Sequence, residues 1–157
     1  MSERVGKMAL LNGMKIACMA NNGCYLSCVY RGFALPIEAV KRAVDDSCLF
    51  TIAALDHNRI VLQAENHCYV SHVNRQDVES VEANKQTIDD SCRFILTVLA
   101  GSTVALQANN GLYLSCIDLG ITDTIEAVKQ DIDAACQFTV FVQTPAGVQK
   151  LEEMNKE

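Results

Sequence analysis

Four kinds of polar residue recur in this chain of 157 residues at a fixed spacing of 44 positions. A packed interior does not require them, because polar groups that leave water unpaired cost free energy. A few well-placed carboxylate, hydroxyl and amide groups near an aromatic could instead orient a sugar, so this set together with the asparagine-containing turns predicts up to three related binding sites. The set comprises Ser27, Ser71 and Ser115; Glu38, Glu82 and Glu126; Lys41, Lys85 and Lys129; and Asp45, Asp89 and Asp133.

The same residues also have a structural interpretation. The serines could satisfy backbone groups in turns. The Glu and Lys side chains could pair with each other or with the next copy of the repeat. The aspartates could cap the turn before the last strand of each copy. The sequence leaves both interpretations open.

Three turns supply the remaining candidate ligand-binding residues. In two of them Asn-Gly separates runs of β-type residues, which is a strong hairpin signal because the turn needs a positive φ. The middle turn has His67 in place of glycine, so it either differs or accepts a strained histidine. The candidates in these turns are Asn21, Asn22, Glu65, Asn66, Asn109 and Asn110.

Catalytic and metal chemistry find little support. The sequence has no GxSxG motif, P-loop, HExxH motif or Rossmann glycine pattern. His67, His72 and Glu79 could gather a metal, but the two histidines lie five residues apart and so on opposite faces of a strand. We therefore expect no enzyme activity, no cofactor and no metal site.

The composition excludes other classes of partner. The net charge is −6, a poor surface for nucleic acid and for anionic membranes. The apolar stretch at residues 8–11 is too short for a signal peptide or a membrane span, so we expect a cytoplasmic protein without membrane insertion. In that compartment the eight cysteines stay reduced. Three of them, Cys48, Cys92 and Cys136, precede a Phe by two residues and should pack beside it as small hydrophobes.

The repeat also defines the domain organisation. We expect a lead-in strand within residues 1–13, three copies over residues 14–57, 58–101 and 102–145, and a charged, frayed tail over 146–157. One copy cannot bury its apolar side alone, so three copies predict a single closed domain with pseudo-threefold symmetry. Its expected core comprises Ala20, Ala64 and Ala108; Tyr25, Tyr69 and Tyr113; and Phe50, Phe94 and Phe138.

The middle of each copy is ambiguous. Ile125, Val128, Ile132 and Ala135 follow helical spacing, which predicts an amphipathic helix. The alternative is a short strand over residues 125–128 followed by a turn over 130–134. Local propensity favours the helix, whereas the hairpin and the copy number favour strands.

The run over residues 92–98, followed by residues 104–115 with Gly111-Leu112-Tyr113-Leu114-Ser115, resembles the repeat of fascin and hisactophilin. It is also similar to the repeats of amaranthin-like agglutinins. These resemblances imply an all-β fold, a β-trefoil built from three 44-residue repeats, with six barrel strands and six capping strands. Our first functional hypothesis is a lectin-like protein that binds glycans. The fascin resemblance implies an actin-binding module as the alternative, and an oligomer-forming structural protein is the third hypothesis.

Overall fold

The computed structural model describes residues 11–32, 34–56 and 58–152, and each copy contributes four strands and one short 3-10 helix. The first copy contains β1 (Lys15–Met19), β2 (Tyr25–Cys28), β3 (Ile37–Lys41), η1 (Asp46–Cys48) and β4 (Phe50–Ala54). The second contains β5 (Arg59–Gln63), β6 (Tyr69–Arg75), β7 (Val78–Lys85), η2 (Asp90–Cys92) and β8 (Phe94–Ala100). The third contains β9 (Thr103–Gln107), β10 (Tyr113–Asp118), β11 (Asp123–Lys129), η3 (Ala134–Cys136) and β12 (Phe138–Thr144), and is followed by β13 (Gly147–Lys150).

The first and last strands of each copy form a closed barrel. Going round the ring, β1 pairs with β4, β4 with β5, β5 with β8, β8 with β9 and β9 with β12, all antiparallel. The ring closes where β12 pairs with β1, with Val142 opposite Ile16. Every barrel strand therefore has two neighbours, which removes the exposed sheet edges that promote aggregation.

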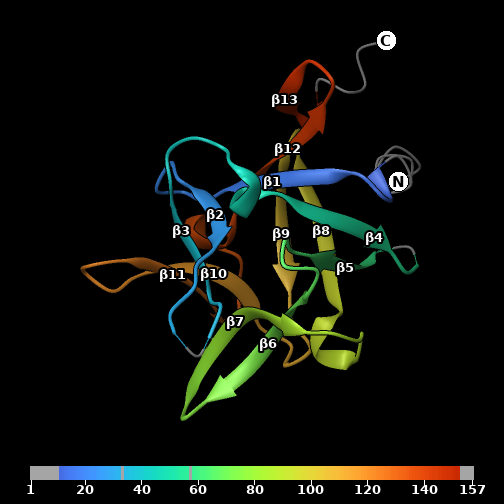
Figure 1. The fold of residues 1–157 in the computed structure, drawn as a ribbon. Coiled ribbons are helices and arrows are strands. Elements are labelled where there is room, and N and C mark those ends of the chain that lie inside the picture. The colour runs from blue at the N-terminus through green and yellow to red at the C-terminus, as the bar shows by residue number, and fades with distance from the viewer. Residues whose placement is uncertain (1–10, 33, 57, 153–157) are drawn as a thin grey trace.

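The middle strands of each copy form three hairpins that cap the barrel: β2–β3, β6–β7 and β10–β11. In Figure 1 the β6–β7 and β10–β11 hairpins project away from the barrel strands. Equivalent contacts join them: Glu38 lies opposite Thr124, Glu126 opposite Ser80, and Pro36 bridges to Glu82. A closed six-stranded barrel with three capping hairpins is a β-trefoil, which confirms the predicted fold class.

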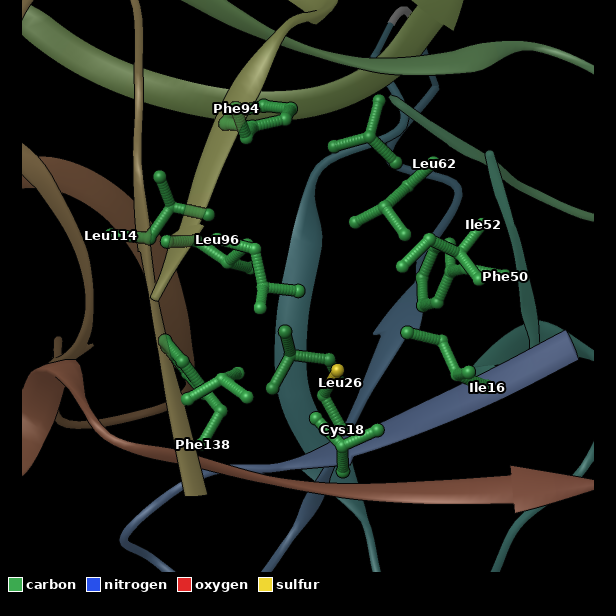
Figure 2. Close-up of a cluster of buried hydrophobic side chains, with 14 of the residues drawn as sticks. Ile16, Cys18, Leu26, Phe50, Ile52, Leu62, Phe94, Leu96, Leu114 and Phe138 are labelled. Carbon is green, nitrogen blue, oxygen red and sulfur yellow. The ribbon is translucent and has the colours of Figure 1, made fainter. Parts of the chain in front are cut away.

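Equivalent side chains from the three copies converge on one interior (Figure 2). Phe50, Phe94 and Phe138 are all buried, as predicted. The alanines predicted for the core are buried too, but Tyr25, Tyr69 and Tyr113 are only half-buried, which corrects that part of the prediction. Tyr25 packs edge-on against Phe141 instead of entering the interior. Other buried threefold sets are Ile16, Ile60 and Val104; Ile52, Leu96 and Val140; Leu26, Val70 and Leu114; and Ile37, Val81 and Ile125.

The ambiguous middle segment is a strand followed by a 3-10 turn. Asp45, Asp89 and Asp133 each cap the 3-10 helix of their copy, as the structural interpretation predicted, by accepting the backbone N–H two residues on. Each also accepts a hydrogen bond or ion pair from the Lys four residues earlier. The buried cysteines at 48, 92 and 136 end these 3-10 helices and do not lie in a strand.

The described residues at the two ends of the chain both pack onto the barrel. Residues 1–10 of the expected lead-in strand lie outside the described residues, while Leu11 is buried against the core and Gly13 donates to the carbonyl of Ile52. The expected frayed tail is ordered over its first part. Strand β13 pairs with β12, and Leu151 is buried in the core. The tail was predicted to be frayed because it is polar. An exposed edge strand such as β13 is also polar.

The capping aspartates should make the fold acid-sensitive. Ser47 and Lys41 hold the pKa of Asp45 well below its ordinary value, and Lys85 and Ser91 do the same for the pKa of Asp89. A depressed folded-state pKa adds stability above the unfolded value of about 4, and this stability is lost as the pH falls below it. We expect the Asp45→Asn/Asp89→Asn/Asp133→Asn variant to lose less unfolding free energy than the native chain between pH 4 and pH 2.

Urea unfolding at a series of pH values measures this difference. Asn keeps a capping oxygen, so the comparison isolates the ionised carboxylate. Asp77→Asn is the matched control, because Asp77 lies in an exposed turn with a positive φ that Asn tolerates. The same acid dependence in the native chain and the triple variant would contradict the assignment.

Candidate functional site

Two polar hollows lie where consecutive copies meet on the barrel. Each is crossed by a row of side chains from three adjacent strands. In the first row, Lys15 lies opposite Thr51, and Thr51 lies opposite Gln63. In the second row, Arg59 lies opposite Ile95, and Ile95 lies opposite Gln107. The second row repeats the first at a spacing of 44 residues, so the pseudo-symmetry of the fold builds the two places alike.

The first junction is a cavity of about 310 Å³ between the first and second copies. Its floor includes Gln63, whose side-chain amide donates to the carbonyl of His67 at 2.9 Å. His67 has a φ of 68°, so the middle turn keeps the conformation that glycine adopts in the other two copies. The cavity is lined by Lys15, Asp46, Leu49, Thr51, Gln63, Ala64, Glu65 and His67.

The second junction is a cavity of about 550 Å³ between the second and third copies. Gln107 is held as its counterpart is, by donating to the carbonyl of Gly111 at 2.8 Å. Arg93 replaces Leu49 here and forms an ion pair with Asp90. The lining is Arg59, Asp90, Arg93, Ile95, Gln107, Ala108, Asn109 and Gly111, which matches the first junction position for position.

The third junction lacks the cation, the glutamine and the aspartate that the other two share. Its row is Thr103, Thr139 and Met19, so a threonine replaces the cation and a methionine replaces the glutamine. Ala134 stands where the other copies have Asp46 and Asp90. Asn21 is the counterpart of Glu65 and Asn109 at this junction. The structure therefore brings Glu65 and Asn109 into the two polar cavities, whereas Asn21 lines neither of them.

The second asparagine position of each candidate turn already forms hydrogen bonds within the protein. The side-chain amide of Asn22 donates to the carbonyl of Ala39, and its oxygen accepts the N–H of Cys24. Asn66 and Asn110 make the same two contacts in their own copies. These asparagines fasten each turn to the cap hairpin.

The Glu and Lys candidates lie on the cap hairpins, and none of them lines either junction cavity. Glu38 and Glu82 are buried and each binds an arginine, Arg31 or Arg75, through two hydrogen bonds. Glu126 has no such partner. Lys41, Lys85 and Lys129 pair with the capping aspartates at 2.8–3.0 Å and not with the glutamates. Lys85 borders a shallow hollow that it shares with His72 and Asp89.

The serines are buried beneath the cap hairpins. Ser71 Oγ donates to the side-chain oxygen of Asn84 at 2.6 Å and also lies 3.5 Å from the backbone carbonyl of Glu82, the kind of backbone contact expected for it. Ser27 Oγ and Ser115 Oγ have no hydrogen-bond partner among the described residues. The hydroxyls are therefore not available to a surface ligand.

The histidine cluster of the second copy connects two copies. His72 contacts Glu79 through Nε2 and Asn109 through Nδ1, the latter at 2.8 Å. This contact places Asn109 at the second junction. Across residues 11–32, 34–56 and 58–152, no three His, Cys, Asp or Glu side chains gather where they could hold a metal ion.

Most junction residues were not among the sequence candidates. Gln63 and Gln107, Lys15 and Arg59, and Asp46 and Asp90 each recur once at a spacing of 44 and then change in the third copy. These residues were not identified because the candidates were residues present in all three copies. The sequence does show them as positions that are alike in two copies and different in the third.

The structure is similar to several solved β-trefoils. The designed threefold-symmetric protein ThreeFoil matches with a TM-score of 0.70 and 14% identity, over 80% of this chain and 96% of that one. A Polyporus squamosus lectin, solved with the human-type influenza-binding epitope Neu5Acα2-6Galβ1-4GlcNAc, matches with a TM-score of 0.70 and 10% identity. A mosquitocidal holotoxin matches with a TM-score of 0.69 and 6% identity.

This chain spans only part of the lectin and of the toxin that it matches. The match spans 84% of this chain but 50% of the lectin, and 82% of this chain but 17% of the toxin. No protein-family model matches the sequence, and no curated protein sequence matches it at a significant level. At identities of 6–14%, these similarities show the β-trefoil fold, which a lectin also has. They do not assign the chain to one family of β-trefoil proteins.

The two asparagines of the first turn should behave differently when replaced. Asn22→Ala removes three hydrogen bonds, two that fasten the turn and one to the carboxylate of Asp123, so we expect it to lower the free energy of unfolding by about 1–2 kcal/mol. Asn21→Ala, its matched neighbour, should change that free energy by less than about 0.5 kcal/mol because Asn21 is exposed. Urea unfolding of both variants measures the difference, and equal losses would contradict the structural role of Asn22.

Proposed function

We propose that this chain is a non-catalytic carbohydrate-binding module that uses its first and second junctions as glycan sites. The observation that carries the proposal is the repetition of one polar cavity, position for position, at two junctions of a fold that a lectin also has.

The chemistry of the cavities suits sugar hydroxyls. Each contains a fixed amide, a cation and a carboxylate, with apolar carbon from an alanine beside them. Such groups donate and accept hydrogen bonds around a ring of hydroxyls, and few of them are needed to fix its orientation. Gln63 and Gln107 are the best anchors, because the turn carbonyls already hold their amides and leave the side-chain oxygens to accept from a ligand.

Two sites on one chain would act together. A glycan with several branches that reaches both junctions gains avidity without any new contact, even when each site alone is weak. The third junction has Thr103, Met19 and Ala134 in place of the cation, the fixed glutamine and the aspartate of the other two. It therefore lacks the charged groups and the anchored amide on which the proposal rests. We therefore reduce the expected number of sites from three to two.

The state of the thiols supports a non-catalytic role. Burial raises the pKa of Cys18 to about 12 and, as the largest cause, raises the pKa of Cys28 and Cys116 to about 11. A nucleophilic cysteine needs the opposite shift. All eight cysteines are free, which is consistent with the cytoplasmic location that we propose.

Within the described part of the chain, no helix has the length and apolar character that crossing a bilayer requires.

A glycan array probed with the labelled full chain tests the ligand class. We expect binding that persists at high salt, because hydrogen bonds to neutral hydroxyls are not screened as charge contacts are. A silent array together with salt-sensitive co-sedimentation with actin filaments would favour the actin-binding alternative. A silent array with a stable homo-oligomer would favour the structural one.

Titration calorimetry with the best monovalent sugar from the array tests the location. We expect about two sites per chain, with one lost in Gln63→Ala and the other lost in Gln107→Ala. Met19→Ala alters the equivalent position of the third junction and should leave both sites intact. Three equal sites, or unchanged binding in the two glutamine variants, would contradict the assignment.

A further inference from the structure

The cap of the β-trefoil contains a place that two copies fill with arginine and the third leaves open. In the first copy, Arg31 Nε and Nη2 donate to the two carboxylate oxygens of Glu38 at 2.9 and 2.6 Å. In the second copy, Arg75 binds Glu82 in the same way at 2.6 and 2.7 Å. The third copy has the equivalent glutamate, Glu126, but Leu119 stands where the arginine would be.

The backbone around the missing arginine is unchanged. Leu119 N–H donates to the carbonyl of Thr122 at 2.9 Å, as Arg31 N–H donates to the carbonyl of Ala34 at 2.8 Å. Gly32 and Gly120 follow with φ values of 84° and 93°. The third copy has therefore kept the hairpin that presents an arginine and has lost only the side chain.

The carboxylate left behind is unpaired. Glu126 is partly buried, and the described residues offer it no hydrogen bond or ion pair, whereas its counterparts are buried beneath a guanidinium. Burial raises the pKa of Glu126, while in Glu82 the effect of burial is outweighed by Arg75 and Ser80, which bring its pKa below the ordinary value. A cation supplied from outside would relieve the cost of the buried charge.

The surroundings favour a partner that is cationic and partly apolar. Residues 117–128 contain three acidic residues and no lysine or arginine. At the tip of this hairpin, Leu119 is 55% exposed and Ile121 is 98% exposed. Solvent-facing aliphatic side chains on the same hairpin as an unpaired carboxylate match an arginine flanked by apolar residues, because the planar guanidinium binds a carboxylate through two parallel hydrogen bonds.

We propose that the β10–β11 hairpin is a docking site for an arginine of another protein, in which Glu126 binds the guanidinium and Leu119 and Ile121 contact the apolar residues beside it. The two intact copies show the geometry that the incoming group adopts. This surface shares no lining residue with the two junction cavities, so the proposal does not depend on glycan binding.

Peptide titration of the ¹⁵N-labelled full chain tests the proposal. The probe is acetyl-Leu-Arg-Leu-amide, and its control carries citrulline, which has the shape of arginine without the charge. We expect amide shift changes centred on Leu119, Ile121 and Glu126, and at least tenfold weaker binding of the citrulline peptide. Glu126→Gln should weaken the arginine peptide at least tenfold, whereas Glu65→Gln, with the same change in net charge, should not.

A second variant tests the geometry from within the chain. Leu119→Arg should fill the open place, raise the melting temperature, abolish peptide binding and move the carboxyl titration of Glu126 to lower pH. Leu119→Ala should leave that titration unchanged.

Three results would overturn the proposal. One is equal affinity for the arginine and citrulline peptides. Another is a Leu119→Arg variant in which Glu126 titrates as in the native chain, because the guanidinium then cannot reach the carboxylate. The third is a concentration-dependent oligomer that both Glu126→Gln and Leu119→Arg abolish, which would assign the place to a second copy of this chain.

Discussion

The pairing of β1 with β12 is the constraint on which the rest of the structure depends. It joins the first copy to the third and leaves no barrel strand with an open edge. Because the ring is closed, Phe50, Phe94 and Phe138 meet in one interior. The end of each copy also lies against the start of the next. Each junction cavity is built from residues of two copies, so neither the proposed glycan sites nor the core could exist in a single copy.

The repeat and the family resemblance together predicted the fold, but they did not predict the sites. A fixed period identified equivalent positions, the hairpin signals supplied strands, and the family resemblance resolved the segment over residues 125–135 in favour of a strand. The cavity rows could not be read in the same way, because Lys15, Thr51 and Gln63 come from three strands whose register appears only in the structure. The half-buried tyrosines were mispredicted because amphipathic aromatics suit a barrel rim as well as an interior.

The residues common to all three copies mainly maintain the fold. Asn22 fastens a turn, Asp45 caps a 3-10 helix, and both roles recur in the other copies. Function is better sought where one copy departs from the others. Met19 occupies the position of the first copy that is equivalent to Gln63 and Gln107. Leu119 occupies the position of the third copy that is equivalent to Arg31 and Arg75. Once the symmetric contacts have secured the barrel, such positions can diverge without loss of the fold.

A crystal structure of the full chain in complex with a sugar that it binds is the most direct test of the two junction sites. We expect electron density for the sugar beside Gln63 and beside Gln107, with their side-chain oxygens accepting hydrogen bonds from its hydroxyls. We also expect no sugar beside Met19. A sugar bound only on the cap hairpins, or at all three junctions alike, would contradict the claim that two copies kept a polar site which the third has lost.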